Sequence, residues 1–491
     1  MIEGPLGDLL AYAQRCGLIH PADTVYARNR VLEVLRIPDY DLRHEGTGSE
    51  AAIDDLLRPL LDDAASRGLI DPDTATQRDL WDTAIMGCLV DRPSALQDRF
   101  WQDYRTGPRA ATDALHAAAV ASNYIRTART DRNVTWTYPS EYGLLDMTIN
   151  LSKPEKDPRD IAAAATGSAA GYPTCLLCRE NEGYAGRADH PARQNLRLIE
   201  LELTGEPWFL QYSPYRYYPE HCIVLSQEHR PMVINPATFR RLAQFTAILP
   251  HYLAGSNADL PIVGGSILSH DHYQGGHYEF PMDRAATLWS TTRQGVDVSV
   301  LRWPLTVVRL FGDDERVLDV ADRVLTGWRS YSDPDRGVLA ATGQTPHNTI
   351  TPIARRVEGR LRLDLVLRNN RTSPDHPDGI FHPHAEIHPI KRENIGLIEV
   401  MGLAVLPDRL HTELRMVADA LMSGGALPDV ASAHEPMLDG LRDADPPADL
   451  AEAYSRARSA ASAYFVQGLE HCSVFGRDVV GGCQDFLAGL D

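Results

Sequence analysis

The sequence predicts an α+β protein whose beginning and end are helical. In the first part of the chain, apolar residues recur at three- and four-residue spacing, which is the pattern of amphipathic helices. Further on, strand-length apolar segments are separated by turn residues, and strand and helix patterns then alternate. With 491 residues, of which 43% are hydrophobic and 23% charged, the composition is that of a globular protein with several structural units.

Residues 1–135 are the predicted helical N-terminal region. The segments DLLAYAQRCGLI and AAIDDLLRPLLDDAASRGLI both carry the helical spacing and both reach a glycine, which commonly ends a helix. An Ala-rich helical pattern occupies 115–130. The composition then changes to residues such as Tyr, Pro, Gly and Thr, and the segment MTINLS predicts a short strand.

Residues 136–295 are the first predicted β/α unit. NLRLIELELTG, PWFLQYSPY and HCIVLSQEH read as strands between turns. A helix is predicted from Pro236 to about Leu253, because Asn235 is a good N-cap and proline suits the first helical position. The unit closes with PIVGGSILSHDHYQGGHYEF, a predicted strand, a glycine pair and a histidine-dense strand.

Residues 296–407 repeat a similar order, with a strand, a helix, a hairpin around Glu358–Gly359 and a second histidine-dense segment. Two β–α units that each end in a His-x-His strand indicate a weak internal duplication. Residues 408–491 are predicted to be helical, with LRDADPPADL as an exposed acidic loop.

Composition excludes several classes of protein. A net charge of −19 argues against a broad nucleic-acid surface, and no apolar run is long enough to cross a membrane. The seven cysteines are scattered, and the first residues lack a basic segment followed by an apolar core. We therefore expect a cytoplasmic protein in a reducing environment.

The histidine-dense segment after the glycine pair is the most informative feature of the sequence. On a strand, His270, His272 and Gln274 point to one face, and the small residues at 264–266 let a phosphate approach backbone N–H groups. A neutral imidazole can attack phosphorus directly, and an amide can bind a phosphoryl oxygen without donating a proton for hydrolysis. Purely structural histidines are the alternative, and the combination of features makes that alternative the weaker one.

The pair Cys175 and Cys178 has the spacing of one knuckle of a tetrahedral zinc site. Such a site needs two more ligands, for which His221, His229 and His270 are candidates. We favour His221 and His270, since each is expected at a strand edge near the knuckle. Two cysteines packed as small apolar residues and a redox dithiol are the alternatives.

Two arginines, Arg187 and Arg193, lie in a glycine-containing stretch just after the knuckle. Arginine binds phosphate in a bidentate manner, which a net-negative protein needs for a phosphorylated ligand. The alternative interpretation is that both arginines are ordinary surface residues that water solvates. In the second histidine-dense segment, His382, His384 and His388 could bind a metal or a sugar phosphate, or could have separate structural roles.

Four long segments of the chain resemble a known family. CLLCRENEGYAGRADHPARQN, FLQYSPYRYYPEHCIVLSQEHRPM, NADLPIVGGSILSHDHYQGGH and HPIKRENIGLIEVMGLAVLP are similar to the type 2 branch of galactose-1-phosphate uridylyltransferases. The resemblance extends over nearly the whole chain, including NYIRTART and PSEYGLLDMTINLSKPEKDPRDIA. It implies the fold of the histidine-triad superfamily, with two antiparallel β/α units in one chain.

The resemblance also implies a ping-pong reaction. A histidine attacks the α-phosphorus of UDP-glucose, glucose 1-phosphate leaves, and a uridylyl-histidine forms. Galactose 1-phosphate then takes the UMP group and becomes UDP-galactose, as in the Leloir pathway of galactose metabolism. The implied partners are these sugar phosphates and a second copy of the chain, with neither nucleic acid nor a membrane. The acceptor range, galactose 1-phosphate alone or N-acetylhexosamine 1-phosphate as well, stays open.

Residue roles follow from the type 1 motif His-Pro-His-x-Gln, which this sequence matches with an aspartate in place of the proline. The match implies that His272 is the nucleophile and that Gln274 holds the phosphoryl group. It implies a structural zinc site and a stretch that binds uridine and phosphate, while a second metal stays an open question. The implied zinc ligands are Cys175, Cys178, His221 and His270, and the implied binding residues are Asn257, Gly265 and Ser266.

Two kinds of rival function remain. A nucleotide hydrolase or dinucleotide phosphorylase of the same superfamily would use the same nucleophile, but hydrolases usually have a third histidine where Gln274 stands. A zinc-binding scaffold without activity is a rival of a different class, and it would leave His272 and Gln274 unexplained. Transfer to a sugar phosphate is therefore the leading hypothesis.

Overall fold

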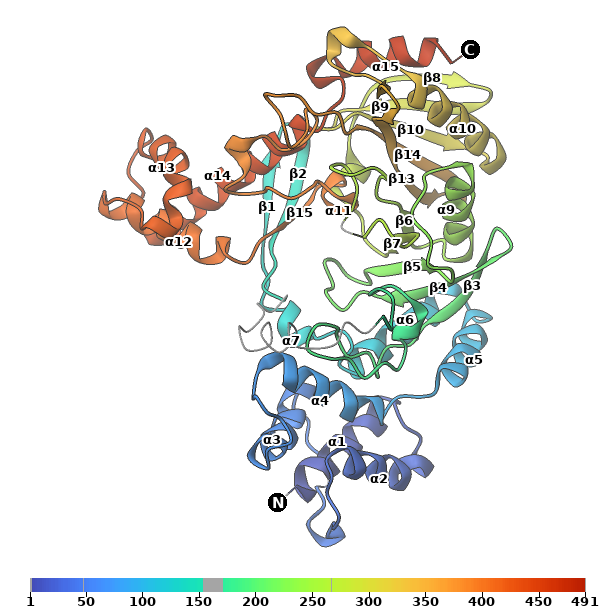
Figure 1. Cartoon of the computed structure of the whole chain (residues 1–491), viewed down its shortest axis with the longest axis vertical. Coiled ribbons are helices and arrows are strands. Elements are labelled where there is room, and N and C mark those ends of the chain that lie inside the picture. The colour runs from blue at the N-terminus through green and yellow to red at the C-terminus, as the bar shows by residue number, and fades with distance from the viewer. Residues whose placement is uncertain (1, 47, 153–170, 266, 491) are drawn as a thin grey trace. The chain divides into compact units, whose positions relative to one another are not determined.

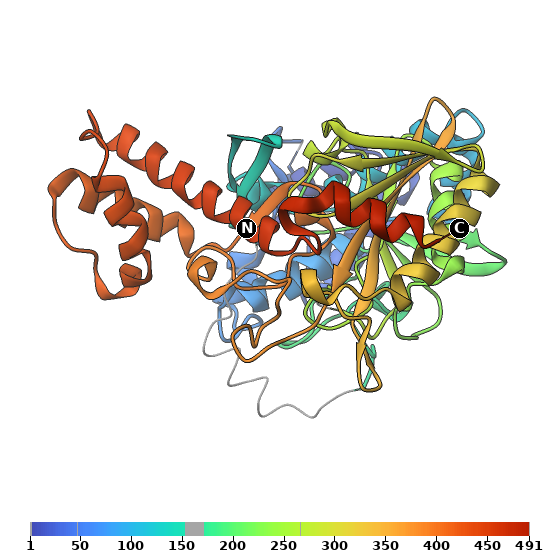
Figure 2. The ribbon, with the colours of Figure 1, turned by 90° about the horizontal axis from the view of Figure 1, so that it is seen from above.

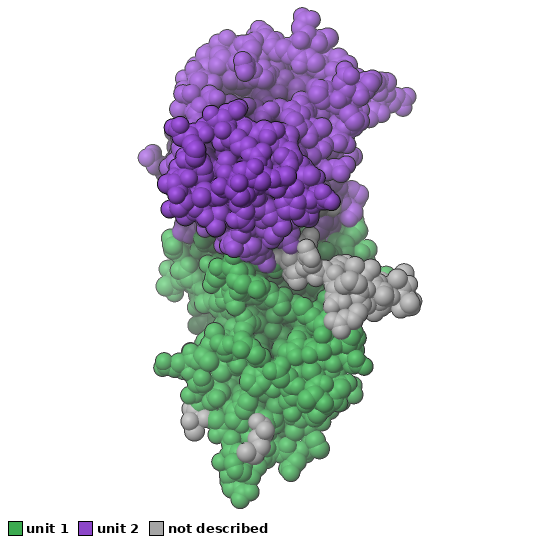
Figure 3. Space-filling model, turned by 90° about the vertical axis from the view of Figure 1, so that its left-hand side faces the viewer, with its two compact units in different colours: residues 1–132, 152–230 green, residues 133–151, 231–491 purple. Residues whose placement is uncertain are grey.

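The computed structural model describes residues 2–46, 48–152, 171–265 and 267–490. These residues form two compact units, which Figure 3 distinguishes by colour. Unit 1 comprises residues 1–132 and 152–230, and unit 2 comprises residues 133–151 and 231–491. The α+β class and the helical ends expected from the sequence are confirmed, while the division into four parts stays a prediction.

Unit 1 begins with four helices around an apolar core, as the spacing of apolar residues predicts (Figure 1). These helices are α1 (Glu3–Arg15), α2 (Thr24–Val34), α3 (Ile53–Ser66) and α4 (Ala75–Gly87). Three more follow, namely α5 (Pro93–Tyr104), α6 (Pro108–Ala121) and α7 (Thr127–Thr130). Three antiparallel strands complete the unit, namely β3 (Ile199–Leu203), β4 (Glu206–Tyr212) and β5 (Cys222–Ser226).

Unit 2 is built on antiparallel strands in the order β7-β6-β13-β14-β10-β9-β8. The strands are β6 (Leu253–Gly255), β7 (His272–Gly276), β8 (Thr287–Arg293), β9 (Val296–Leu301), β10 (Val307–Gly312), β13 (Asn348–Val357) and β14 (Arg360–Asn369). The hairpin between β13 and β14 turns at Glu358 and Gly359, as predicted, and both residues have positive φ. Within this sheet, Gly255 pairs with Gln274, so β6 lies directly beside the strand of the predicted nucleophile.

Helices α9 (Pro236–Ile248) and α10 (Asp314–Ser330) pack on strands of this sheet (Figure 1). The predicted N-cap of α9 is confirmed, because the Asn235 side chain accepts a hydrogen bond from the Thr238 N–H. On the side of the sheet covered by α9, Arg241 lies 3.8 Å from the Asp271 carboxylate, and both side chains are buried. Alternation along β7 leaves His272 and Gln274 for the opposite face.

A smaller sheet and the C-terminal helices complete unit 2. In the smaller sheet, β1 (Val134–Ser140), β2 (Gly143–Ile149) and β15 (Leu403–Leu406) pair in the order β1-β2-β15. The remaining elements are the hairpin strands β11 (Ala341–Thr342) and β12 (Thr345–Pro346), and the helices α11 (Leu397–Val400), α12 (Leu410–Ser423), α13 (Glu435–Arg442), α14 (Leu450–His471) and α15 (Val479–Ala488). Figures 1 and 2 both show α12 and α13 packed along α14, to one side of the large sheet. Among the described residues, no helix combines the length and apolarity needed to cross a bilayer.

Two strand predictions are wrong. The strand predicted to begin at Pro261 is absent, because residues 261–263 form a turn. The second histidine-dense segment was predicted to be a strand, but His382 and His384 lie outside any strand and a short 3-10 helix (Ala385–Ile387) follows them. Pro383 has no N–H to give to a strand partner, and the His384 N–H donates to the Nδ1 atom of His471 instead. The two histidine-dense segments therefore differ in local structure.

Candidate active site and metal centre

His272 opens β7 and is only 6% exposed. Its Nδ1 lies 2.7 Å from the backbone carbonyl of His270, which can only accept, so Nδ1 carries the proton. Burial lowers the pKa of His272 to about 4, and the ring is therefore neutral at pH 7. A neutral ring with Nδ1 protonated has its lone pair on Nε2, which is the form that acts as a nucleophile.

Gln274 follows two positions later on the same strand and is partly exposed. Strand alternation places its side chain on the His272 face, while Tyr273 points the other way and is 1% exposed. The predicted common face of His272 and Gln274 thus agrees with the strand geometry. His270, which was expected on the same strand, comes before β7 begins and is fully buried.

The predicted phosphate-binding stretch lies between β6 and β7. Asn257 is 5% exposed, and a Cβ atom on Gly265 would lie 2.6 Å from the Asn257 Nδ2. A side chain at position 265 would have to displace the Asn257 side chain, so the glycine lets the backbone of the turn lie against the Asn257 amide. Ser266, which was predicted to bind substrate, lies outside the described residues.

The cysteine knuckle of unit 1 is formed as expected. The Sγ atoms of Cys175 and Cys178 are 3.5 Å apart, and the Leu177 N–H points at the Cys175 Sγ from 3.4 Å. Asn181 fixes the loop, because its Nδ2 donates to the carbonyls of Cys175 and Cys178 at 2.8 and 2.7 Å. His190 holds the Asn181 Oδ1 from 2.6 Å. Neither Asn181 nor His190 has a metal-ligand spacing, so the sequence carries no signal for their roles in this loop.

The histidine beside this knuckle is His229, not His221. The Nδ1 atom of His229 lies 3.2 Å from the Cys178 Sγ, whereas the buried ring of His221 packs against the rings of Tyr217 and Tyr218. The ligand atoms of Cys175, Cys178 and His229 all lie within 4.8 Å of one another. Two thiols and an imidazole at this spacing are a donor set that suits tetrahedral zinc.

The two predicted phosphate-binding arginines are engaged within unit 1. Arg187 forms an ion pair with Asp189 at 2.5 Å and donates to the Tyr184 hydroxyl at 2.8 Å. The guanidinium of Arg193 stacks 5.7 Å from the ring centroid of Tyr124. Both arginines help to organise the loop after the knuckle, and their predicted contact with a phosphate stays a prediction.

The second histidine-dense segment divides into two environments. His384 joins Glu386 and the α14 residue His471 in a group whose ligand atoms lie within 4.8 Å of one another. The His384 ring is stacked on His471 at 4.0 Å. His382 instead faces Asn394, and the Nε2 atom of His388 lies 3.1 Å from the Pro383 carbonyl. Within the part of the chain that the structure describes, His384 is thus the only one of the three predicted histidines in a cluster suited to a metal.

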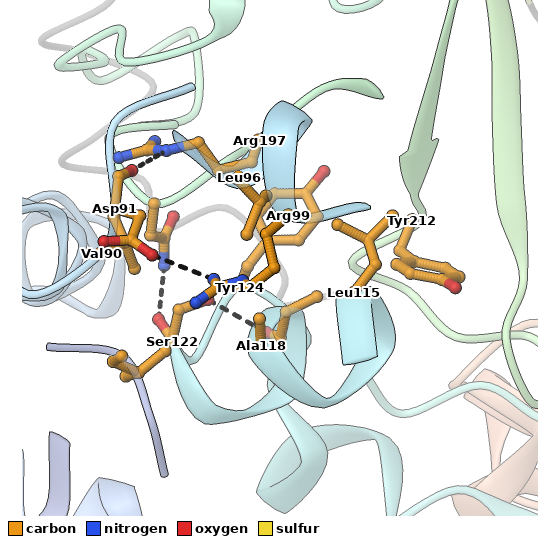
Figure 4. A pocket seen from close by; sticks show the side chains of 13 residues that line it. Val90, Asp91, Leu96, Arg99, Leu115, Ala118, Ser122, Tyr124, Arg197 and Tyr212 are labelled. Atoms are coloured by element: carbon orange, nitrogen blue, oxygen red, sulfur yellow. Dashed lines mark hydrogen bonds and ion pairs between the residues drawn. The ribbon is translucent and has the colours of Figure 1, made fainter. Parts of the chain in front are cut away.

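Unit 1 also encloses a small cavity between α5, α6 and β4 (Figure 4). The volume of this cavity is about 30 Å³, which is room for one or two water molecules. This volume is far below that of a nucleotide site. The Tyr124 hydroxyl is buried at this cavity and has no hydrogen-bond partner among the described residues. The cavity is therefore a place for ordered water and not the substrate site.

These features define a class of protein. The buried neutral histidine on β7 is followed on the same face by an amide side chain and preceded by a glycine turn. A neutral imidazole is a group that can act as a nucleophile. The Cys–Cys–His group adds a candidate structural metal centre.

Comparisons with known proteins identify the family. The model of the galactose-1-phosphate uridyl transferase N-terminal domain matches residues 17–231, and that of the C-terminal domain matches residues 246–436. The chain belongs to the galactose-1-phosphate uridyl transferase family.

Curated relatives carry a consistent name. A galactose-1-phosphate uridylyltransferase of Clostridium acetobutylicum is 51% identical over 426 residues, which cover 86% of this chain and 85% of the relative. Proteins of the same name from Bacillus subtilis and Halalkalibacterium halodurans are 51% and 52% identical, over 85% and 84% of this chain and 83% of each relative.

Proposed function

We propose that this protein is a nucleotidyltransferase that moves UMP from UDP-glucose to galactose 1-phosphate, in galactose metabolism. Family membership and the names of relatives at about half identity support the substrates. The observation that carries the chemistry is the His272 ring, which is buried, neutral and has its Nδ1 proton directed at the His270 carbonyl.

In the first half-reaction, the Nε2 atom of His272 attacks the α-phosphorus of UDP-glucose. A nitrogen–phosphorus bond forms, the bond from phosphorus to the bridging oxygen breaks, and glucose 1-phosphate leaves with the electron pair. Positive charge develops on the ring. The His270 carbonyl oxygen stabilises this charge because it accepts a hydrogen bond from the Nδ1–H group, at an N–O distance of 2.7 Å. The hydrogen bond therefore both selects the reactive tautomer and favours the intermediate.

In the second half-reaction, a phosphate oxygen of galactose 1-phosphate attacks the same phosphorus and releases His272. The Gln274 amide holds a non-bridging oxygen in both steps and has no acidic proton for a leaving group. This chemistry favours transfer over the hydrolase alternative. A dinucleotide phosphorylase would need the same nucleophile, and the names of the relatives argue for the uridylyltransferase.

Zinc is proposed as the structural metal of the cysteine knuckle. We assign Cys175, Cys178 and His229 as ligands, so that His229 takes the place first given to His221. His270, the further ligand that the family resemblance implies, stays a prediction. When bound, the ion would neutralise two thiolates and cross-link the loop that Asn181 already orders.

Intact-protein mass spectrometry after mixing the enzyme with UDP-glucose alone tests the proposal. We expect a mass gain of one UMP that is lost when galactose 1-phosphate is added. Accumulation of free UMP without an adduct would assign the protein to the hydrolases. Absence of both adduct and UMP would contradict the proposed donor.

A further inference from the structure

A segment of the second histidine-rich region holds the glycine turn that precedes the nucleophile. Asn394 donates from Nδ2 to the backbone carbonyl of Gly264 at 3.2 Å. Three residues later, the Leu397 N–H donates to the Oδ1 atom of Asn257 at 2.9 Å, in a buried contact. Two side-chain amides thus join residues 394–397 to the turn at 257–265, although more than a hundred residues separate them in the sequence.

This segment is itself fixed to the interior of unit 2. Arg368 on β14 is 1% exposed and donates from both Nη atoms to the Ile395 carbonyl at 3.2 Å. Behind Asn394, the Nε2 atom of the buried His382 lies 3.3 Å from the Asn394 Oδ1. Glu399 accepts from the Gly396 N–H and pairs with the buried Lys391 at 2.7 Å. Buried contacts therefore fix the backbone around Asn394, although Asn394 itself is exposed.

The turn needs such a support because its backbone is strained. Ile262 has φ of 74°, a left-handed conformation that β-branched residues rarely adopt. Strain of this kind persists only where the surroundings impose it, and it is concentrated at functional sites. Ile262 packs against Gly379, where a Cβ atom would come within 2.9 Å of its Cγ2. The same region of the chain thus holds the turn at both Ile262 and Gly264.

The turn also has a defined position relative to the reacting strand. Gly255, the last residue of β6, pairs with Gln274, and Asn257 follows two residues later. A shift of the turn would therefore move the backbone N–H groups at Gly264 and Gly265 relative to Gln274 and His272. Groups that hold a phosphate must keep their geometry closely to be effective.

We propose that Asn394 is a positioning residue that holds the Gly264–Gly265 turn in the shape that binds the nucleotide phosphates. This inference rests on the proposed function, since it takes the turn as the phosphate site of a uridylyltransferase. The turn holds the phosphate in the ground state and in the transition state alike. Loss of the Asn394 side chain therefore weakens substrate binding and leaves the rate of the chemical step nearly unchanged.

The test compares Asn394→Ala with Asn394→Asp and with a matched control. The control is Asn370→Ala, because Asn370 donates from Nδ2 to the Pro261 carbonyl of the same loop at 3.3 Å. We expect Asn394→Ala to raise the KM for UDP-glucose about three- to tenfold, the worth of one hydrogen bond, with kcat within twofold. Asn394→Asp should raise it at least as much, because an oxygen then faces the Gly264 carbonyl. The control should change KM less than twofold.

A merely structural role would give a different result. If Asn394→Ala lowers the melting temperature and kcat but leaves KM unchanged, or if KM changes no more than in the control, the positioning role is wrong. Because Asn394 is exposed, the substitution leaves no cavity and the variant is expected to fold.

Calorimetric titration with UDP separates this inference from the proposed function. Weaker UDP binding by Asn394→Ala, together with a wild type that binds UDP but forms no UMP adduct, would support the positioning role and contradict transfer. Equal UDP binding by all variants, with a normal adduct, would contradict the positioning role alone. No UDP binding by the wild type would overturn both.

Discussion

The hydrogen bond from the His272 Nδ1 to the His270 carbonyl determines which ring nitrogen can react. We predict that His272→Ala lowers turnover at least a thousandfold and abolishes the UMP adduct, because no other group on this strand face can form the nitrogen–phosphorus bond. Loss of a buried ring also costs stability, so the adduct measured by mass is the decisive readout. His277→Ala is the control from the same segment and should keep the adduct. Adduct formation by His272→Ala would assign the nucleophile elsewhere.

A second prediction at the scale of residues separates His229 from His221. His229 is exposed and lies against Cys178, so His229→Ala should lower the zinc content severalfold with little direct loss of packing. His221 is 3% exposed and packs on two tyrosine rings, so His221→Ala should lower the melting temperature but retain the metal. Metal per chain is measured by mass spectrometry. Zinc loss in His221→Ala with full retention in His229→Ala would reverse the assignment.

These two histidines show what the pattern of residues could predict at this scale. The cysteine spacing and the need for further ligands were visible in the sequence, and His229 was among the candidates. His221 directly precedes β5 and His229 follows three residues after that strand ends. Choosing between them requires knowing which end of β5 faces the knuckle, and a local pattern does not contain that information.

At the scale of elements, the cap of α9 stabilises a helix that packs on the large sheet. Asn235→Ala removes the acceptor for the Thr238 N–H and should lower the free energy of unfolding by about 1 kcal/mol. Asn235→Asp keeps an acceptor and adds a charge that suits the helix N-terminus, so it should be close to neutral. Urea unfolding of the two variants measures the difference. Equal stability of Asn235→Ala and wild type would show that the cap contributes nothing.

Elements with a strong local signal were predicted well, whereas the strand predicted around His384 failed because of a contact that is distant in the sequence. The cap and proline that begin α9, and the turn at Glu358–Gly359, are determined by residues within a few positions of each other. The segment around His384 was predicted to be a strand because its histidines alternate. The His384 N–H instead donates a hydrogen bond to the Nδ1 atom of His471, 87 residues further along the chain. Pairings of this kind are invisible to periodicity.

At the scale of the whole molecule, the sequence predicted the α+β class but not the order of the strands. Strand β6 pairs with β13 through Ile353 and Gly255, which are about a hundred residues apart. Such pairings depend on packing across the sheet, because each strand could bond to several partners. The two histidine-triad-like units implied by the resemblance stay a prediction for the same reason.

At the same scale, a carboxylate buried in the large sheet contributes to stability in a way that depends on pH. Asp364 on β14 is 1% exposed, and Arg309 on β10 donates to both of its oxygens, at 2.7 and 2.9 Å. Burial alone would raise the pKa of Asp364, but the nearby arginines Arg309 and Arg362 outweigh it. They hold the pKa below the ordinary value of 3.8. The charged form is therefore stabilised more in the folded chain than in the unfolded chain.

The sign of the pH effect follows from this lowered pKa. The contribution of Asp364 to stability is fully present above pH 3.8 and is lost as the pH falls from there through the lower pKa of the folded state. Asp364→Asn leaves the buried Arg309 without its counter-charge, while Arg362 keeps its ion pair with Asp283. We expect a loss of about 3–5 kcal/mol at pH 7. Asp314→Asn, in the more exposed pair with Arg356, is the control and should cost under about 1 kcal/mol. In urea unfolding at pH 7 and pH 3, the difference in the free energy of unfolding between wild type and Asp364→Asn should narrow at the lower pH. The unfolded chain then takes up a proton at Asp364 more readily than the folded chain does. A difference that is the same at both pH values would show that packing, and not the charge of Asp364, joins β10 to β14.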